Sequence, residues 1–246
     1  MMLIDVIGSA DTFEKQMVGA LVAADFRTAD VFTKYGIDYC CGGQKTIGQA
    51  CIEQAIHLET IREEVTKAVE SGKLSEQYNH WALDFLSDYI VNQHHHYAKN
   101  ITPRLSAMVK TVIEVHGEEH SELHTVGAIW QAISGELVAH MQKEELILFP
   151  YIRQLVHSTE EGISIQPPAF GSAAELIYLM EEEHQATGDQ LAALAELSNG
   201  FTPPADACNT YQMLYTYLAD FQAMTRMHVH LENNILFPKV IALENQ

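Results

Sequence analysis

Two apolar segments of the sequence carry the same pair of polar residues. HMQKEELILFP occupies residues 140–150 and HVHLENNILFP occupies residues 228–238, and in each segment a glutamate follows a histidine by four positions. In a helix, two such side chains point the same way and lie within reach of one ion. Imidazole nitrogen and carboxylate oxygen are ligands that transition metals accept, so the repeat predicts a metal site. The residues are His140, Glu144, His228 and Glu232.

The hydrophobic pattern places both pairs on a buried helix face. Val126, Ile133 and Leu137 lead at helical spacing to His140, and a similar apolar stripe leads to His228. A carboxylate without a partner in an apolar core costs several kcal/mol. We therefore expect each glutamate to be neutralised or to bind a cation.

Histidines on two further helices extend the pattern. Ile177, His184 and Leu191 are spaced by seven residues, which puts His184 on a core seam. In NQHHHYAK, neighbouring positions differ by about 100° around the helix, and the periodicity leaves His94 and His95 as alternatives. Inward His and Glu side chains from four facing helices are how bundles build dinuclear sites. Nitrogen and oxygen ligands without thiolate favour iron or manganese, although zinc also accepts them.

The elements that must position these residues are helices. Pairs of prolines at residues 167–168 and 203–204 lie in loop-like stretches, and few β-branched alternating runs occur. We predict an all-α fold, an up-down-up-down four-helix bundle preceded by a small helical domain. Pro103 should kink or divide the first long helix. The long helices are expected at 79–116, 121–156, 172–198 and 207–245, the small domain at 1–75 and the bundle domain at 79–246.

Composition excludes several classes of partner. Fourteen basic and 33 acidic residues give the 246-residue chain a net charge of −19, which argues against nucleic acid or an anionic membrane as partner. No basic leader and no apolar run of membrane-spanning length is present, so a cytoplasmic protein is expected. The 4 cysteines do not form a secreted disulfide framework.

Several motifs together resemble one known family. DYCCGG at 38–43, HHHYAKNITPRL at 94–105, VHGEEHSEL at 115–123, HMQKEELILFP, MEEEHQATG at 180–188 and HVHLENNILFP occur in this order. The set is similar to the repair-of-iron-centres family, di-iron proteins that restore damaged iron–sulfur clusters. That resemblance covers nearly the whole chain. It implies a short N-terminal domain with the YCCGG motif and a haemerythrin-like four-helix bundle.

The resemblance also implies a set of metal ligands. It favours His95, eight residues before Pro103, over His94, and it adds His116 from the VHG motif. Thr102 stands where the family has leucine, which is a mild departure. Glu136 and Glu183 match acidic residues near the site in relatives, where they would move protons or tune the metal; the alternative is that they are solvated helix glutamates. The implied ligands of two irons are His95, His116, His140, Glu144, His184, His228 and Glu232.

Cys40 and Cys41 leave two interpretations open. Beside Gly42 and Gly43 they can simply shape a turn, or their thiols can ligate a soft metal or exchange with another thiol. The resemblance implies a thiol role at a client protein or in iron handling. The remaining histidines, His94 and His230 among them, are expected on the surface.

The expected function is repair of iron–sulfur clusters after nitrosative or oxidative stress, by supplying iron to damaged client proteins. The alternatives are a haemerythrin-like protein that binds or senses O₂ or nitric oxide, and a di-iron enzyme that reduces NO. The resemblance also allows a homodimer.

Overall fold

The computed structural model describes residues 7, 10–71, 76–163, 168 and 170–246. Helices joined by turns and loops make up this described part, with one isolated bridge between Met17 and Thr46. Internal contacts divide the chain into two compact units. The N-terminal unit contains residues 1–86 and 229–246, and the bundle unit contains residues 87–228. The all-α prediction is confirmed.

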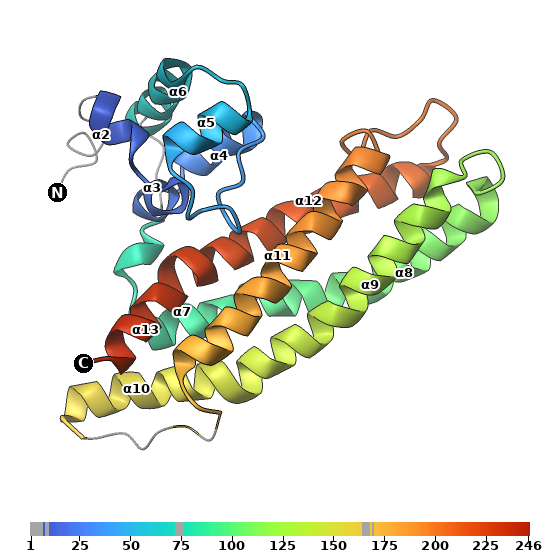
Figure 1. The fold of residues 1–246 in the computed structure, drawn as a ribbon. Helices are drawn as coiled ribbons and strands as arrows, with labels where there is room; N and C mark the ends of the chain where they lie inside the picture. The colour runs from blue at the N-terminus through green and yellow to red at the C-terminus, as the bar shows by residue number, and fades with distance from the viewer. Residues whose placement is uncertain (1–6, 8–9, 72–75, 164–167, 169) are drawn as a thin grey trace. The chain divides into compact units, whose positions relative to one another are not determined.

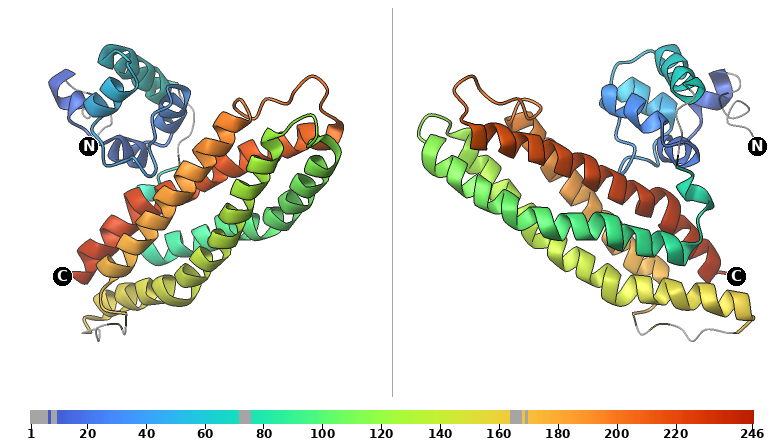
Figure 2. Two further views of the ribbon diagram at one scale, coloured as in Figure 1. Left: turned by 45° about the vertical axis from the view of Figure 1, so that its right-hand side comes forward. Right: turned by 180° about the vertical axis from the view of Figure 1, so that it is seen from behind.

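Long helices of the bundle run along one another, as the views in Figures 1 and 2 agree. They are broken by short π-helical segments (η2, η3 and η4) that continue the helix without a loop. In chain order the elements from residue 83 onward are α7 (Leu83–Tyr89), η2 (Ile90–His95), α8 (His96–His116), α9 (Glu122–Lys143), η3 (Glu144–Leu148), α10 (Phe149–Glu161), α11 (Ala173–Leu197), α12 (Asn209–Leu231), η4 (Glu232–Leu236) and α13 (Phe237–Glu244). Of these, η4 and α13 belong to the N-terminal unit.

The apolar stripes predicted from the sequence form the bundle core. Val126, Trp130 and Ile133 of α9 are buried together with side chains of α8, α11 and α12. The ring of Trp130 meets that of Phe221 edge to face at 5.1 Å, and its Nε1 donates to Ser106 Oγ at 2.9 Å. The indole thus satisfies its one polar atom while filling the core, and this packing fixes the rotation of α9 about its own axis.

Prolines follow two of the π-helical segments at equivalent places. Pro150 and Pro238 each stand in the first turn of the helix that follows, α10 or α13. A proline supplies no N–H group and clashes with the preceding turn of a regular α-helix, and the wider π turn lets the helix pass through this position. Pro103 lies inside α8 and does not divide it, so of the two expected outcomes only a kink at this position stays a prediction.

The N-terminal unit has its own apolar core. Phe13, Phe32, Ile47 and Ile61 are each fully buried in it. Its helices lie where the sequence predicts a small helical domain. Residues 72–75 lie outside the described residues, so the expected boundary between domains at 1–75 and 79–246 stays a prediction. The elements are α2 (Ala10–Glu14), α3 (Val18–Ala24), α4 (Thr28–Lys34), α5 (Ile47–Glu53), α6 (Leu58–Glu70) and η1 (Tyr78–His80).

Among the described residues, no helix is both long and apolar enough to cross a bilayer.

Candidate metal centre

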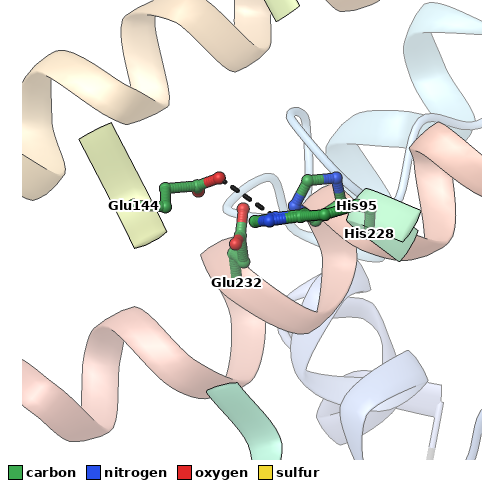
Figure 3. A group of neighbouring side chains, drawn as sticks. All are labelled: His95, Glu144, His228 and Glu232. Carbon is green, nitrogen blue, oxygen red and sulfur yellow. Dashed lines mark ion pairs between the residues drawn. The ribbon is translucent and has the colours of Figure 1, made fainter. Parts of the chain in front are cut away.

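Six of the predicted ligands gather into two buried groups. Their ligand atoms lie within 4.8 Å of one another in each group, and both carboxylates, Glu144 and Glu232, belong to both groups. Figure 3 shows the members of one group pointing toward one another. All six side chains are buried. The first group is His95, Glu144, His228 and Glu232, and the second is His140, Glu144, His184 and Glu232.

Helical geometry accounts for the pairing within each segment. His140 lies in the last turn of α9 and Glu144 opens η3, while His228 lies in the last turn of α12 and Glu232 opens η4. Because α12, η4 and α13 are one continuous helix, Glu232 takes its place one turn after His228 from that helix alone. A π-helical segment thus begins at each glutamate, and η2 ends at His95. Such segments are rare and often occur at functional sites.

Distances at Glu144 indicate room for two ions. Its Oε2 lies 3.2 Å from His95 Nε2, and its Oε1 lies 3.1 Å from His140 Nε2. The two oxygens therefore face histidines of different groups. His184 Nε2 lies 2.9 Å from His140 Nε2, so two imidazole nitrogens are aimed at a common point. Buried carboxylates among convergent imidazoles fit divalent cations by number, charge and donor type.

Two of these histidines each have a further glutamate beside Nδ1, the ring nitrogen that faces away from the site. Glu145 Oε1 lies 2.7 Å from His95 Nδ1 and accepts a hydrogen bond from Lys99 at 2.6 Å. Glu183 Oε2 lies 2.7 Å from His140 Nδ1, and its other oxygen pairs with Lys143. A carboxylate on Nδ1 fixes the tautomer, so that Nε2 is presented to a metal as a lone pair.

The charges around the site favour this arrangement. Burial would raise the pKa of Glu183, but hydrogen bonds from Lys143 and His140 outweigh it and lower that pKa. The pKa of Glu145 is lowered in the same way by Lys99 and His95. Burial drives the pKa of His228 well below its usual value. This imidazole is therefore neutral at pH 7, the form that binds metals.

Other residues expected at the site lie elsewhere. His116 ends α8, 21 positions after His95 and so about 30 Å along the helix, where its ring contacts Tyr211. His116 belongs to neither group of candidate ligands among the described residues, so its role as a ligand stays a prediction that our proposed ligand set does not include. Glu136 is exposed and accepts a long 3.5 Å hydrogen bond from Gln190. Of the two predicted outer glutamates, only Glu183 contacts a candidate ligand in the described structure.

Some residues that matter were missed by the sequence interpretation. Glu145 follows Glu144 directly and gave no signal of its own, because its partner His95 lies on another helix. His94 and His230 were expected on the surface, yet both are buried. The ring of His94 stacks on His228 at 5.7 Å, and that of His230 meets Tyr39 at 5.6 Å. Cys40 and Cys41 belong to a separate group with Asp38 in the N-terminal unit.

Comparisons with known proteins agree with this architecture. The family described as the hemerythrin HHE cation binding domain matches residues 86–240, and ScdA_N, a domain of unknown function, matches residues 14–69. The chain is 33% identical over 229 residues to a protein of Yersinia pestis (strain Pestoides F) named iron-sulfur cluster repair protein YtfE, covering 93% of this chain and 98% of that protein. A protein of the same name from Yersinia pseudotuberculosis serotype O:1b (strain IP 31758) is 32% identical over the same shares of the two chains.

Proposed function

The chain belongs to the repair-of-iron-centres family, iron–sulfur cluster repair proteins with a hemerythrin-type cation-binding domain, and on this premise we propose that it restores damaged iron–sulfur clusters by supplying iron from a di-iron site. The clients are proteins whose clusters nitrosative or oxidative stress has damaged. We further propose a cytoplasmic location, as expected from the sequence.

The shared carboxylates carry this proposal. Glu144 and Glu232 each lie in both groups of candidate ligands. A carboxylate has two oxygens, so one glutamate can join two cations, and the two buried charges are best offset when both cations are bound. Four histidines add one nitrogen donor each. The proposed ligands are His95, His140, Glu144, His184, His228 and Glu232.

The residues around the proposed ligands orient two of the histidines and connect one of them to solvent. Iron bound at this site would be the redox-active cation that is transferred to a damaged cluster. Glu145 and Glu183 fix the orientation of His95 and His140 through their Nδ1 atoms. Because Glu183 is itself 41% exposed in its side chain, this carboxylate links a buried imidazole to solvent. The proton on His140 Nδ1 can therefore exchange with solvent by way of Glu183.

The test combines iron content with repair on one sample. We expect about two irons per chain after growth with adequate iron, and recovery of activity when this protein is added to an enzyme with a damaged [4Fe–4S] cluster. The metal-stripped protein and a Glu232→Leu variant should give no recovery, whereas a Glu136→Gln variant should match the unchanged chain. Reversible binding of O₂ or NO by a di-iron protein that restores no cluster would contradict the proposal and favour a gas-binding function.

A further inference from the structure

A short loop of the N-terminal unit brings three potential metal ligands together. This loop, here called the dithiol loop, comprises residues 37–44. Ligand atoms of Asp38, Cys40 and Cys41 lie within 4.8 Å of one another. Asp38 Oδ1 accepts hydrogen bonds from Cys40 N at 2.9 Å and Cys40 Sγ at 3.0 Å, and Oδ2 accepts one from Gly42 N at 2.8 Å. The carboxylate is therefore fixed by the backbone while one of its oxygens faces a thiol.

We propose that Asp38, Cys40 and Cys41 form a second metal site, which binds one thiophilic divalent cation such as Zn²⁺ or Fe²⁺. The Sγ atoms of Cys40 and Cys41 are 3.9 Å apart. Two thiolates bound to one tetrahedral ion at about 2.3 Å would be about 3.8 Å apart, so the thiols already stand at the separation that a shared cation requires. The same separation is far from the roughly 2.05 Å of a disulfide, and neither cysteine forms a disulfide.

Binding of a cation at this site is balanced by the release of protons from the thiols. The Cys40 thiol is within hydrogen-bond distance of Asp38 Oδ1. A cation at this place would bind the same sulfur and the same oxygen, and the proton would go to solvent. Binding to both thiols releases up to two protons, with no change of oxidation state and no further reactant.

The loop is braced so that its ligands keep their places. Asn234 Nδ2 of η4, within the same unit, donates to Tyr39 O at 3.1 Å and Cys40 O at 3.3 Å. Gly42 and Gly43 permit this tight course: a Cβ on Gly42 would lie 2.9 Å from Asp38 O, and one on Gly43 would lie 2.7 Å from Tyr39 O. Close approach of the backbone therefore requires glycine at both positions. The hydrogen bonds from Asn234 hold the backbone that carries the cysteines.

Exposure leaves one side of the site accessible. Cys40 is buried, Cys41 is half-buried and Asp38 is exposed. Three protein donors leave the fourth position of a tetrahedral cation open, as in catalytic zinc sites. A thiolate of another protein can take that position, so the site is suited to passing a cation on to a cysteine-ligated acceptor; this last role alone rests on the proposed repair function.

Cobalt provides a direct test, because thiolate ligation of Co²⁺ gives an intense near-ultraviolet charge-transfer band that nitrogen and oxygen ligands do not give. The full chain with Cys51→Ala and Cys208→Ala keeps only the two loop thiols. We expect titration of this metal-free protein with Co²⁺ to give the band, with one sulfur-bound Co²⁺ per chain. Cys40→Ser or Cys41→Ser should abolish the band, and Asp38→Asn should weaken binding at least about tenfold.

The bundle site serves as the internal control. Glu144→Leu should lower the total Co²⁺ bound and leave the thiolate band intact. Circular dichroism would show whether each variant is folded. A folded protein without the band, or a band that survives both serine variants, would overturn the proposed site. Repair of a damaged cluster by a protein that shows no band would overturn the site and leave the repair function standing, whereas the band without any repair would support the site and contradict the function.

Discussion

Replacing Glu183 by glutamine tests whether the outer carboxylates tune the metal centre. The Glu183 oxygen lies 2.7 Å from His140 Nδ1, and glutamine keeps a hydrogen-bond acceptor there but removes the negative charge. Loss of such an outer partner typically weakens metal binding by about 10- to 100-fold, or about 1.4–2.7 kcal/mol. Because His140 belongs to only one of the two groups, we expect one of the two bound ions to be weakened and the other to be nearly unaffected.

The effect on folding should be small by comparison. Glu183 also pairs with Lys143, but the two side chains are 41% and 36% exposed, and such pairs contribute about 0–1 kcal/mol. Metal-free Glu183→Gln protein should therefore melt close to the unchanged chain, so the loss in affinity will not reflect unfolding. Affinity is measured by competition between the protein and a coloured chelator for Fe²⁺ or Zn²⁺.

Two matched variants make the result decisive. Glu145→Gln should weaken the other ion, the one held by His95, to a similar extent. Glu136→Gln removes the same charge from an exposed position on α9 and should change neither affinity. If Glu183→Gln weakens binding no more than Glu136→Gln does, the reasoning from the Nδ1 contacts is refuted.

Three further results are expected. Glu144→Leu should lose both ions, and elemental analysis that still finds about two irons per chain would contradict the shared role of this carboxylate. A Cys40→Ser/Cys41→Ser protein should keep its irons yet fail to restore a damaged cluster; full recovery would leave the two thiols with a structural role only. Asp206 raises the pKa of His120 through a 3.0 Å contact, so the pair stabilises the fold below the usual histidine pKa and this contribution fades as pH rises through the raised value. The melting temperature of Asp206→Asn protein should therefore change less than that of the unchanged chain between about pH 6 and about pH 9, and identical pH profiles would refute this.

The His-x-x-x-Glu pairs on the apolar helix faces could be predicted because helical periodicity is a local feature of the sequence. His140 and Glu144 continue an apolar stripe of their own helix, so their burial follows from neighbours a few residues away. Glu145 could not be found in this way. Its partner His95 stands 50 residues earlier in the chain, and only packing of two helices shows that the two side chains meet. The same limit left the periodicity undecided between His94 and His95, both of which are buried.

The sequence also could not show that His230 is buried on a second face of its helix. His230 points away from the stripe that contains His228 and so resembled a solvated residue. In the structure it lies against Tyr39 and Phe26 of the N-terminal unit. Burial lowers its pKa to about 3, so it is neutral at pH 7. A face that is covered by a segment almost 200 residues away carries no local signal.

The repeat of a His-x-x-x-Glu pair, a π turn and a Phe-Pro step in α9–α10 and again in α12–α13 bears on the origin of the fold. Each half of the bundle is a helical hairpin whose first helix supplies one candidate histidine and whose second helix supplies a full pair. The two groups are crossed, because one takes its histidines from η2 and α12 and the other from α9 and α11. Each group takes ligands from both hairpins, so neither hairpin completes an ion site alone and both must be folded against each other before either ion meets its full ligand set. The shared pattern of the two halves is what duplication of a single hairpin would leave in a chain.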